Sequence, residues 1–170
     1  MLRNLLMIAL LCISTGAMAQ ADNAGETKIN YRDNGSDLPP IKIVTLKGNT
    51  IKNKDVRYNG NLFVMMFNPT CGHCEDETDL LEKNIFLFKK SKLVLACAPS
   101  MRTYLETFVA THHTDEFPKT ITVGLDSSGL IDKTFRYEQM PQINIYDKNR
   151  KLIKVFTGST AIKELKKYIQ

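Results

Sequence analysis

A Cys-Gly-His-Cys sequence stands between a predicted strand and a predicted helix, and it constrains the fold of this chain more than any other feature. Residues 62–67 form a continuous apolar run, as expected of a buried strand. Residues 68–70, Asn-Pro-Thr, end this run. Residues 75–83 favour a helix, with acidic side chains in the first turns. The pattern therefore predicts Cys71 at the N-terminal tip of a helix and Cys74 one turn inside it.

Two thiols at a helix N-terminus indicate redox chemistry. The thiolate is the nucleophile in thiol–disulfide exchange, and the free N–H groups and positive dipole end of a helix stabilise it. We expect Cys71 to be the exposed attacking thiol and Cys74 to be the partly buried thiol that resolves the mixed disulfide. A charge or hydrogen bond from His73 favours the thiolate, whereas the acids after Cys74 disfavour it. The sequence does not decide which effect is larger.

Metal chemistry is the alternative for the same pair. A Cys-X-X-Cys sequence can supply half of a zinc site, and a copper-delivery module would use the pair with one distant histidine. The remaining histidines, His112 and His113, are adjacent and therefore poorly placed to bind one ion together from a helix. A purely structural disulfide is disfavoured even more, because so short a loop restricts the unfolded chain little. No metal ligands are assigned from the sequence.

Residues 1–19 have the pattern of a cleavable secretory signal. Arg3 is the positive start, residues 5–13 are uncharged and mostly apolar, and residues 17–19 form a small-x-small cleavage site. This pattern predicts export to the periplasm, with an uncleaved membrane anchor as the alternative. Few cysteines remain after cleavage, so we expect no disulfide-stapled scaffold. Cys97 lies in an apolar run and is expected to be a buried free thiol, with a third redox role as the alternative.

The rest of the chain predicts one α/β domain. Residues 20–37 are polar and are expected to be a flexible lead-in, and residues 38–170 are long enough for one domain with a core. Strands and helices alternate after an initial hairpin, which predicts a mixed sheet with helices on both faces. The predicted strands are 41–46, a short one from 51, 62–67, 93–98, 120–123, 142–146 and 152–156; the predicted helices run from 75 to the mid-eighties, 101–113, 127–135 and 160–169.

The order of these features resembles the thioredoxin superfamily, and more narrowly its exported TlpA/ResA-type branch. The resemblance rests on the strand, the Cys-Gly-His-Cys motif and helix, and a later Met-Pro before a strand, a hairpin and a final helix. It spans residues 38–170, and the Gly-His dipeptide is that of protein disulfide isomerase. It implies a thioredoxin-like fold with a central mixed β-sheet, an N-terminal β-hairpin and an αβ insertion at about 101–135.

The resemblance also implies roles for residues around the cysteines. Pro141 corresponds to a proline that is cis in the family and lies against the cysteine pair, whereas most X–Pro bonds are trans. Met140, before it, is expected to bind the partner chain through its backbone and to make an apolar contact. Tuning of the pair and docking of the substrate are expected from these two residues and from the residues beside the cysteines, namely Pro69, Thr70, Gly72 and His73.

Three features depart from the family pattern, and one of them is the run of acids after Cys74. Thr70 stands where an aromatic residue commonly precedes the first cysteine, and Met65 stands where many thioredoxins hold a buried carboxylate. The absence of a carboxylate at Met65 weighs against fast reductase turnover of the thioredoxin kind. A peroxidase of the peroxiredoxin type needs Thr or Ser three residues before its reactive cysteine, and Asn68 holds that place before Cys71.

The sequence therefore predicts a thiol–disulfide oxidoreductase that exchanges disulfides through Cys71 and Cys74, in the reductase or the isomerase direction. Such exchange needs no bound cofactor. The expected partners are cysteine-containing exported proteins and a membrane-linked thiol electron donor or acceptor, with the protein acting as a monomer. The net charge is +5, but the sequence has no basic stripe with interleaved aromatic residues. The charge therefore does not indicate nucleic-acid binding.

Overall fold

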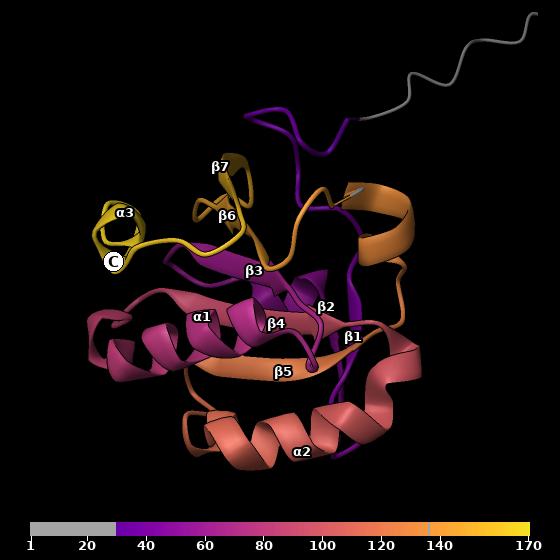
Figure 1. Ribbon diagram of the computed structural model, residues 1–170. Helices are drawn as coiled ribbons and strands as arrows, with labels where there is room; N and C mark the ends of the chain where they lie inside the picture. Colours follow the sequence, from indigo (N-terminus) through magenta and orange to yellow (C-terminus); the bar gives the residue numbers. More distant parts are fainter. Residues whose placement is uncertain (1–29, 136) are drawn as a thin grey trace, which may run out of the picture.

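The computed structural model describes residues 30–135 and 137–170, which form a seven-stranded sheet with the order β2-β1-β5-β4-β3-β6-β7 (Figure 1). The pairs β3–β4 and β4–β5 are parallel, and the outer pairs are antiparallel, so the sheet is mixed as predicted. The strands are β1 (Lys42–Val44), β2 (Thr50–Lys52), β3 (Leu62–Met66), β4 (Lys92–Cys97), β5 (Ile121–Asp126), β6 (Gln142–Tyr146) and β7 (Leu152–Thr157).

Two hydrophobic cores lie on opposite faces of the sheet. One core packs side chains from α1 (Gly72–Lys83), α2 (Arg102–His112) and α3 (Ile162–Leu165). The other packs the residues before β1, the 3-10 helix η1 (Asn53–Val56) and the π-helix η5 (Leu130–Phe135). Helical segments therefore flank both faces, as predicted. Three further 3-10 turns connect elements: η2 (Ile85–Leu87), η3 (Pro99–Met101) and η4 (Thr114–Glu116).

Strand β3 explains the continuous apolar run before the cysteines. All five of its residues are buried, with Phe63 and Met65 in the α1 core and the alternate residues in the opposite core. A strand between two neighbours and covered on both faces has no solvent-facing side, so its sequence does not alternate. The chain leaves β3 at the carboxyl end of the parallel strands, where functional residues of α/β sheets commonly lie.

Several predicted element boundaries differ from the structure. The first helix ends at Lys83 rather than in the mid-eighties, because Asn84 caps it: its N–H donates to Leu81 O at 3.2 Å and its Nδ2 to Leu80 O at 2.9 Å. The strand predicted at 120–123 continues to Asp126, and the following helix begins only at Leu130. The last helix, predicted over 160–169, is regular only at Ile162–Leu165.

Part of the segment predicted to be a flexible lead-in is attached to the sheet. Gly35 N–H donates to Leu152 O at 2.8 Å, and Leu152 N–H donates to Ser36 O at 2.8 Å. Lys151 and Asp37 form an ion pair at 2.8 Å. The boundary at residue 38 stays a prediction, and the signal predicted at 1–19 lies outside the described residues. No helix in the described part of the chain is long and apolar enough to span a membrane.

The buried face of α1 should control the stability of the fold. Leu81 is 1% exposed in the α1 core, whereas its neighbour Leu80 is half-buried. We expect Leu81→Ala to lower the free energy of unfolding by about 2–5 kcal/mol, because it leaves a cavity. Leu80→Ala should cost about 1 kcal/mol or less. Urea denaturation of both variants measures the difference, and equal losses would contradict the assigned packing.

Candidate active site

The loop before the first cysteine is shaped by a local turn. Asn68 Oδ1 accepts hydrogen bonds from Thr70 N–H and Thr70 Oγ1, both at 2.9 Å, and Cys71 N–H donates to Asn68 O at 3.1 Å. An Asn side chain that binds backbone two residues on is a common way to stabilise a turn. Pro69 is buried and Thr70 is exposed. The role of Asn68 was not predicted from the sequence beyond ending the strand.

Cys71 is the N-cap residue of α1, as the sequence predicts. Its carbonyl accepts the first hydrogen bonds of the helix, from Cys74 N–H at 2.8 Å and Glu75 N–H at 3.1 Å. The first N–H groups of a helix point toward its tip, where they favour negative charge. Gly72 and His73 occupy this first turn and are exposed. A thiolate at Cys71 is therefore placed where the helix stabilises it.

The two thiols lie close together but in different surroundings. Cys71 is half-buried, whereas Cys74 is fully buried, and both are free thiols. The pKa of Cys74 is raised to about 12, mainly by burial; a backbone hydrogen bond at Asn68 lowers it, and a hydrogen bond with the Cys71 thiol raises it. Cys74 therefore stays protonated at neutral pH. The attacking and resolving roles of the two thiols stay a prediction.

The predicted proline lies in the same part of the molecule. The Met140–Pro141 peptide bond is cis, as the resemblance implies. Pro141 is buried, and half-buried Met140 packs against the same core as Cys71 and Cys74. Pro141 O accepts a hydrogen bond from Gly158 N–H at 2.8 Å, which joins this segment to the loop after β7.

Glu77 is a buried acid whose importance the sequence pattern did not reveal. Its side chain is 2% exposed, Oε2 accepts a hydrogen bond from Thr160 N–H at 2.8 Å, and Oε1 has no partner among the described residues. Burial raises the pKa of Glu77. Thr160 Oγ1 in turn donates to Gly158 O at 3.3 Å. These bonds connect the turn of α1 after Cys74 to the loop after β7. Gly158 of that loop donates to Pro141 O.

The buried position of Glu77 bears on the missing carboxylate noted at Met65. Met65 is fully buried in the same core as Cys74, so this strand position is apolar. Glu77 supplies a buried carboxyl group from the helix instead, on the turn after Cys74. The neighbouring acids Glu75 and Asp76 are half-buried and exposed, so the presence of acids in this run does not indicate which of them is buried. Only the helical spacing of Glu77 from Cys74 could have suggested its burial.

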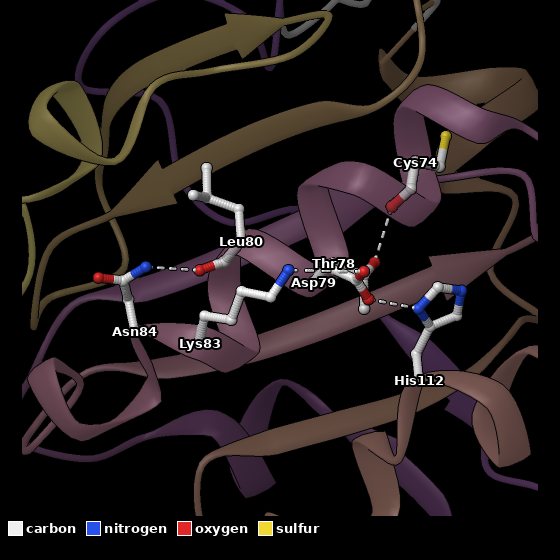
Figure 2. A network of polar contacts seen from close by, with 7 residues as sticks. All are labelled: Cys74, Thr78, Asp79, Leu80, Lys83, Asn84 and His112. Atoms are coloured by element: carbon white, nitrogen blue, oxygen red, sulfur yellow. Dashed lines mark hydrogen bonds and ion pairs between the residues drawn. The ribbon is translucent and has the colours of Figure 1, made fainter.

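A second polar contact on α1 involves a histidine from α2 (Figure 2). His112 Nδ1 lies 2.6 Å from Asp79 Oδ1. Thr78, the residue before Asp79, donates from its Oγ1 to Cys74 O at 2.8 Å. His112 is thus buried beside α1, whereas His113 is exposed. The described residues contain no group of three His, Cys, Asp or Glu side chains arranged to hold a metal ion. Cys97 is buried, and burial raises its pKa to about 12.

The different surroundings of the thiols should appear in their alkylation rates. At about pH 8, a thiol with the pKa of Cys74 is roughly 10⁻⁴ thiolate. We expect iodoacetamide to modify Cys71 at least about 100-fold faster than Cys74 or Cys97 in the reduced native protein. Mass spectrometry of peptides measures each rate, and urea-unfolded protein is the control. Equal rates in the folded protein would show that the thiols are not differentiated.

Burial of Glu77 should make the stability depend on pH. Its raised pKa means that the folded protein binds this proton more tightly than the unfolded chain, so its contribution to stability falls as pH rises from about 4.5 through the folded pKa. Glu77→Gln keeps an oxygen acceptor for Thr160 but cannot ionise. We expect the variant to lose less stability over this range than the unchanged protein.

Urea denaturation at a series of pH values measures this effect. Asp76→Asn is the matched control, because Asp76 is an exposed acid on the same helix and its removal should leave the pH profile nearly unchanged. Parallel profiles for the unchanged protein and Glu77→Gln would contradict the assigned burial of the charge.

Comparisons with known proteins agree with this geometry. No protein-family model matches the chain. It is 25% identical to the thiol-disulfide oxidoreductase ResA of Bacillus thuringiensis subsp. konkukian, over 99% of this chain and 95% of that protein. It is 24% identical, with the same coverage, to the protein of that name from Bacillus cereus.

Solved structures share the fold at low sequence identity. The thioredoxin domain of a thiol-disulfide oxidoreductase from Bacteroides vulgatus superposes with a TM-score of 0.65 at 18% identity, covering 81% of this chain and 99% of that one. StoA from Bacillus subtilis gives a TM-score of 0.60 at 16% identity, covering 78% and 98%. With the two thiols close together at the start of α1, these findings support a thiol–disulfide oxidoreductase with a thioredoxin-like fold that is similar to the ResA proteins.

Proposed function

We propose that this oxidoreductase exchanges disulfides with cysteine-containing exported proteins, with Cys71 attacking and Cys74 resolving. The observation that carries the proposal is the contrast between a half-buried thiol at a helix N-cap and a buried, protonated thiol one turn later. An exposed thiolate can reach a partner disulfide, whereas a buried thiol can react only with the sulfur beside it. Pro69, Thr70, Gly72 and His73 would surround the attacking sulfur.

In the reducing direction, the Cys71 thiolate attacks one sulfur of the partner disulfide. The partner S–S bond breaks, a mixed disulfide with Cys71 forms, and the released partner thiolate takes up a proton. Cys74 then loses its proton and attacks Cys71 Sγ, which releases the second partner thiolate and forms the Cys71–Cys74 disulfide. Two electrons pass to the partner. The buried carboxyl group of Glu77 is the proposed acceptor for the Cys74 proton.

The Met140–Pro141 segment is proposed to bind the partner chain. Met140 is half-buried against the same core as Cys71, so an extended partner segment beside Met140 would bring its disulfide to the attacking sulfur. We infer that the Met140 backbone pairs with the main chain of the partner. Main-chain pairing tolerates different partner sequences. No bound cofactor is required, and one chain contains the complete site.

The proposed place of action is the periplasm, after removal of residues 1–19. The named ResA relatives and the signal pattern at the start of the sequence support this. A membrane-linked thiol donor or acceptor would then restore the pair after each reaction. N-terminal sequencing of the exported protein tests the location, and a mature chain that still contains residues 1–19 would favour an anchored form.

Cysteine variants test the assigned roles. Cys71→Ser should lower the rate of insulin reduction by at least about 100-fold, because it removes the nucleophile. Cys74→Ser should instead accumulate mixed disulfides through Cys71, which non-reducing gels and mass spectrometry detect. Cys97→Ser is the matched control and should keep most of the activity. Trapping that proceeds through Cys74 would reverse the assignment.

The direction of exchange should follow from the reduction potential of the Cys71–Cys74 pair, measured in glutathione buffers. A value near about −270 mV, like thioredoxin, would assign a reductase. A value between about −180 and −120 mV would assign an isomerase or oxidant. We expect His73→Ala to lower the potential, because loss of a group that favours the thiolate destabilises the reduced form. An unchanged potential would remove His73 from the tuning residues.

A further inference from the structure

A groove lies between the start of α1, the helix that begins at the attacking thiol, and one side of α2. Its volume is about 400 Å³, and Pro69 and Thr70, which immediately precede Cys71, form part of its wall. Glu75 contributes from α1, and Tyr104, Phe108 and His112 contribute from α2. The groove is therefore continuous with the surface that a partner disulfide must approach.

His112 presents an unpaired nitrogen in this groove. The side chain is 9% exposed, and Nδ1 lies 2.6 Å from Asp79 Oδ1. A carboxylate only accepts hydrogen bonds, so Nδ1 donates to Asp79, and Nε2 is the ring nitrogen left without this contact. The described residues offer Nε2 no hydrogen-bond partner, and Figure 2 shows this nitrogen on the side of the ring away from Asp79.

The charges around the groove are acidic. Glu75 is the charged carboxyl group in its wall, and Asp79 and the half-buried Glu82 lie behind His112 on α1. Nearby cations are already engaged: Lys83 is 3.9 Å from Asp79. On α2, Arg102 is 3.8 Å from Glu106. The groove wall therefore carries the carboxyl group of Glu75, which suits a positively charged donor.

The walls of the groove suit the apolar stem of such a group. Phe108 is buried, with its ring centroid 4.5 Å from that of His112, while Tyr104 is 55% exposed at the rim. Lysine and arginine side chains commonly lay their methylene groups along apolar surface and place the cation over an aromatic ring.

We propose that this groove is a specificity site that takes a lysine or arginine side chain close to the reactive cysteine of the partner protein. The cation pairs with Glu75, and its stem packs against the rings of Phe108, Tyr104 and His112 that line the groove. Asp79 acts as a positioning residue that holds the histidine ring. The inference rests on the proposed disulfide exchange and adds a preference for basic partner sequences.

Peptides with one internal disulfide test this preference. Lysine, norleucine or glutamate is placed at each of three positions on either side of one cysteine, and kcat/KM for reduction by the reduced protein is measured. At one position or more, we expect the lysine peptide to exceed the glutamate peptide by about 10-fold or more, with norleucine between them. Glu75→Gln should reduce this ratio to about 3-fold or less.

The ratio separates the groove from the general effect of charge on the thiol. Removing an acid near Cys71 alters its reactivity toward every peptide equally, so this effect cancels in the lysine-to-glutamate ratio. Asp76→Asn is the matched control, because it removes the same charge from an exposed neighbouring residue outside the groove wall. Tyr104→Ala, at an exposed position, should raise KM selectively for the lysine peptide.

Equal kcat/KM for lysine and glutamate peptides at every position would overturn the proposal. An equal fall of the lysine-to-glutamate ratio in Glu75→Gln and in Asp76→Asn would also overturn it. Reduction of hydroxyethyl disulfide, which is small and uncharged, distinguishes this result from failure of the proposed function. If the protein cannot reduce that compound, disulfide exchange itself is contradicted. Binding of the lysine peptide to Cys71→Ser/Cys74→Ser protein, followed by NMR at Tyr104 and His112, then tests the groove alone.

Discussion

Burial of β3 on both faces is the constraint on which the rest of the structure depends. Its side chains enter the core under α1 and the opposite core alternately, so the strand has no freedom to shift or rotate. The chain must leave it at a defined edge of the sheet, where Asn68 turns it directly into α1. The position of Cys71 at the helix tip thus follows from packing at the centre of the molecule.

Helix α1 connects that centre to two neighbouring parts of the site, and one further bond lies within the helix. Thr78 binds the carbonyl of Cys74, Glu77 binds the loop that holds Pro141, and Asp79 binds His112 of α2. These residues are consecutive and therefore point in different directions around the helix. A single helix thereby places the thiols, the proline segment and the groove wall relative to one another.

Burial also differentiates groups of the same chemical type. Cys71 and Cys74 are both thiols, but only Cys74 is enclosed and held protonated. Three acids of one run also differ: Glu75 lines the groove, Glu77 is buried and Asp79 holds a histidine. Exposure and partners, rather than residue type, decide which of them can act as nucleophile, proton acceptor or contact for a cation.

The sequence by itself determined the α/β class, the strand–helix junction around Cys71 and Cys74, and the hairpin between β6 and β7, because hydrophobic periodicity and turn residues act locally. It placed helix ends less well, since Asn84 and Asp126 act through hydrogen bonds that periodicity does not show. Only the tertiary structure decided that Glu77 is buried and that His112 meets Asp79. Those contacts join residues 83 and 33 positions apart, and their geometry exists only once the sheet brings the elements together.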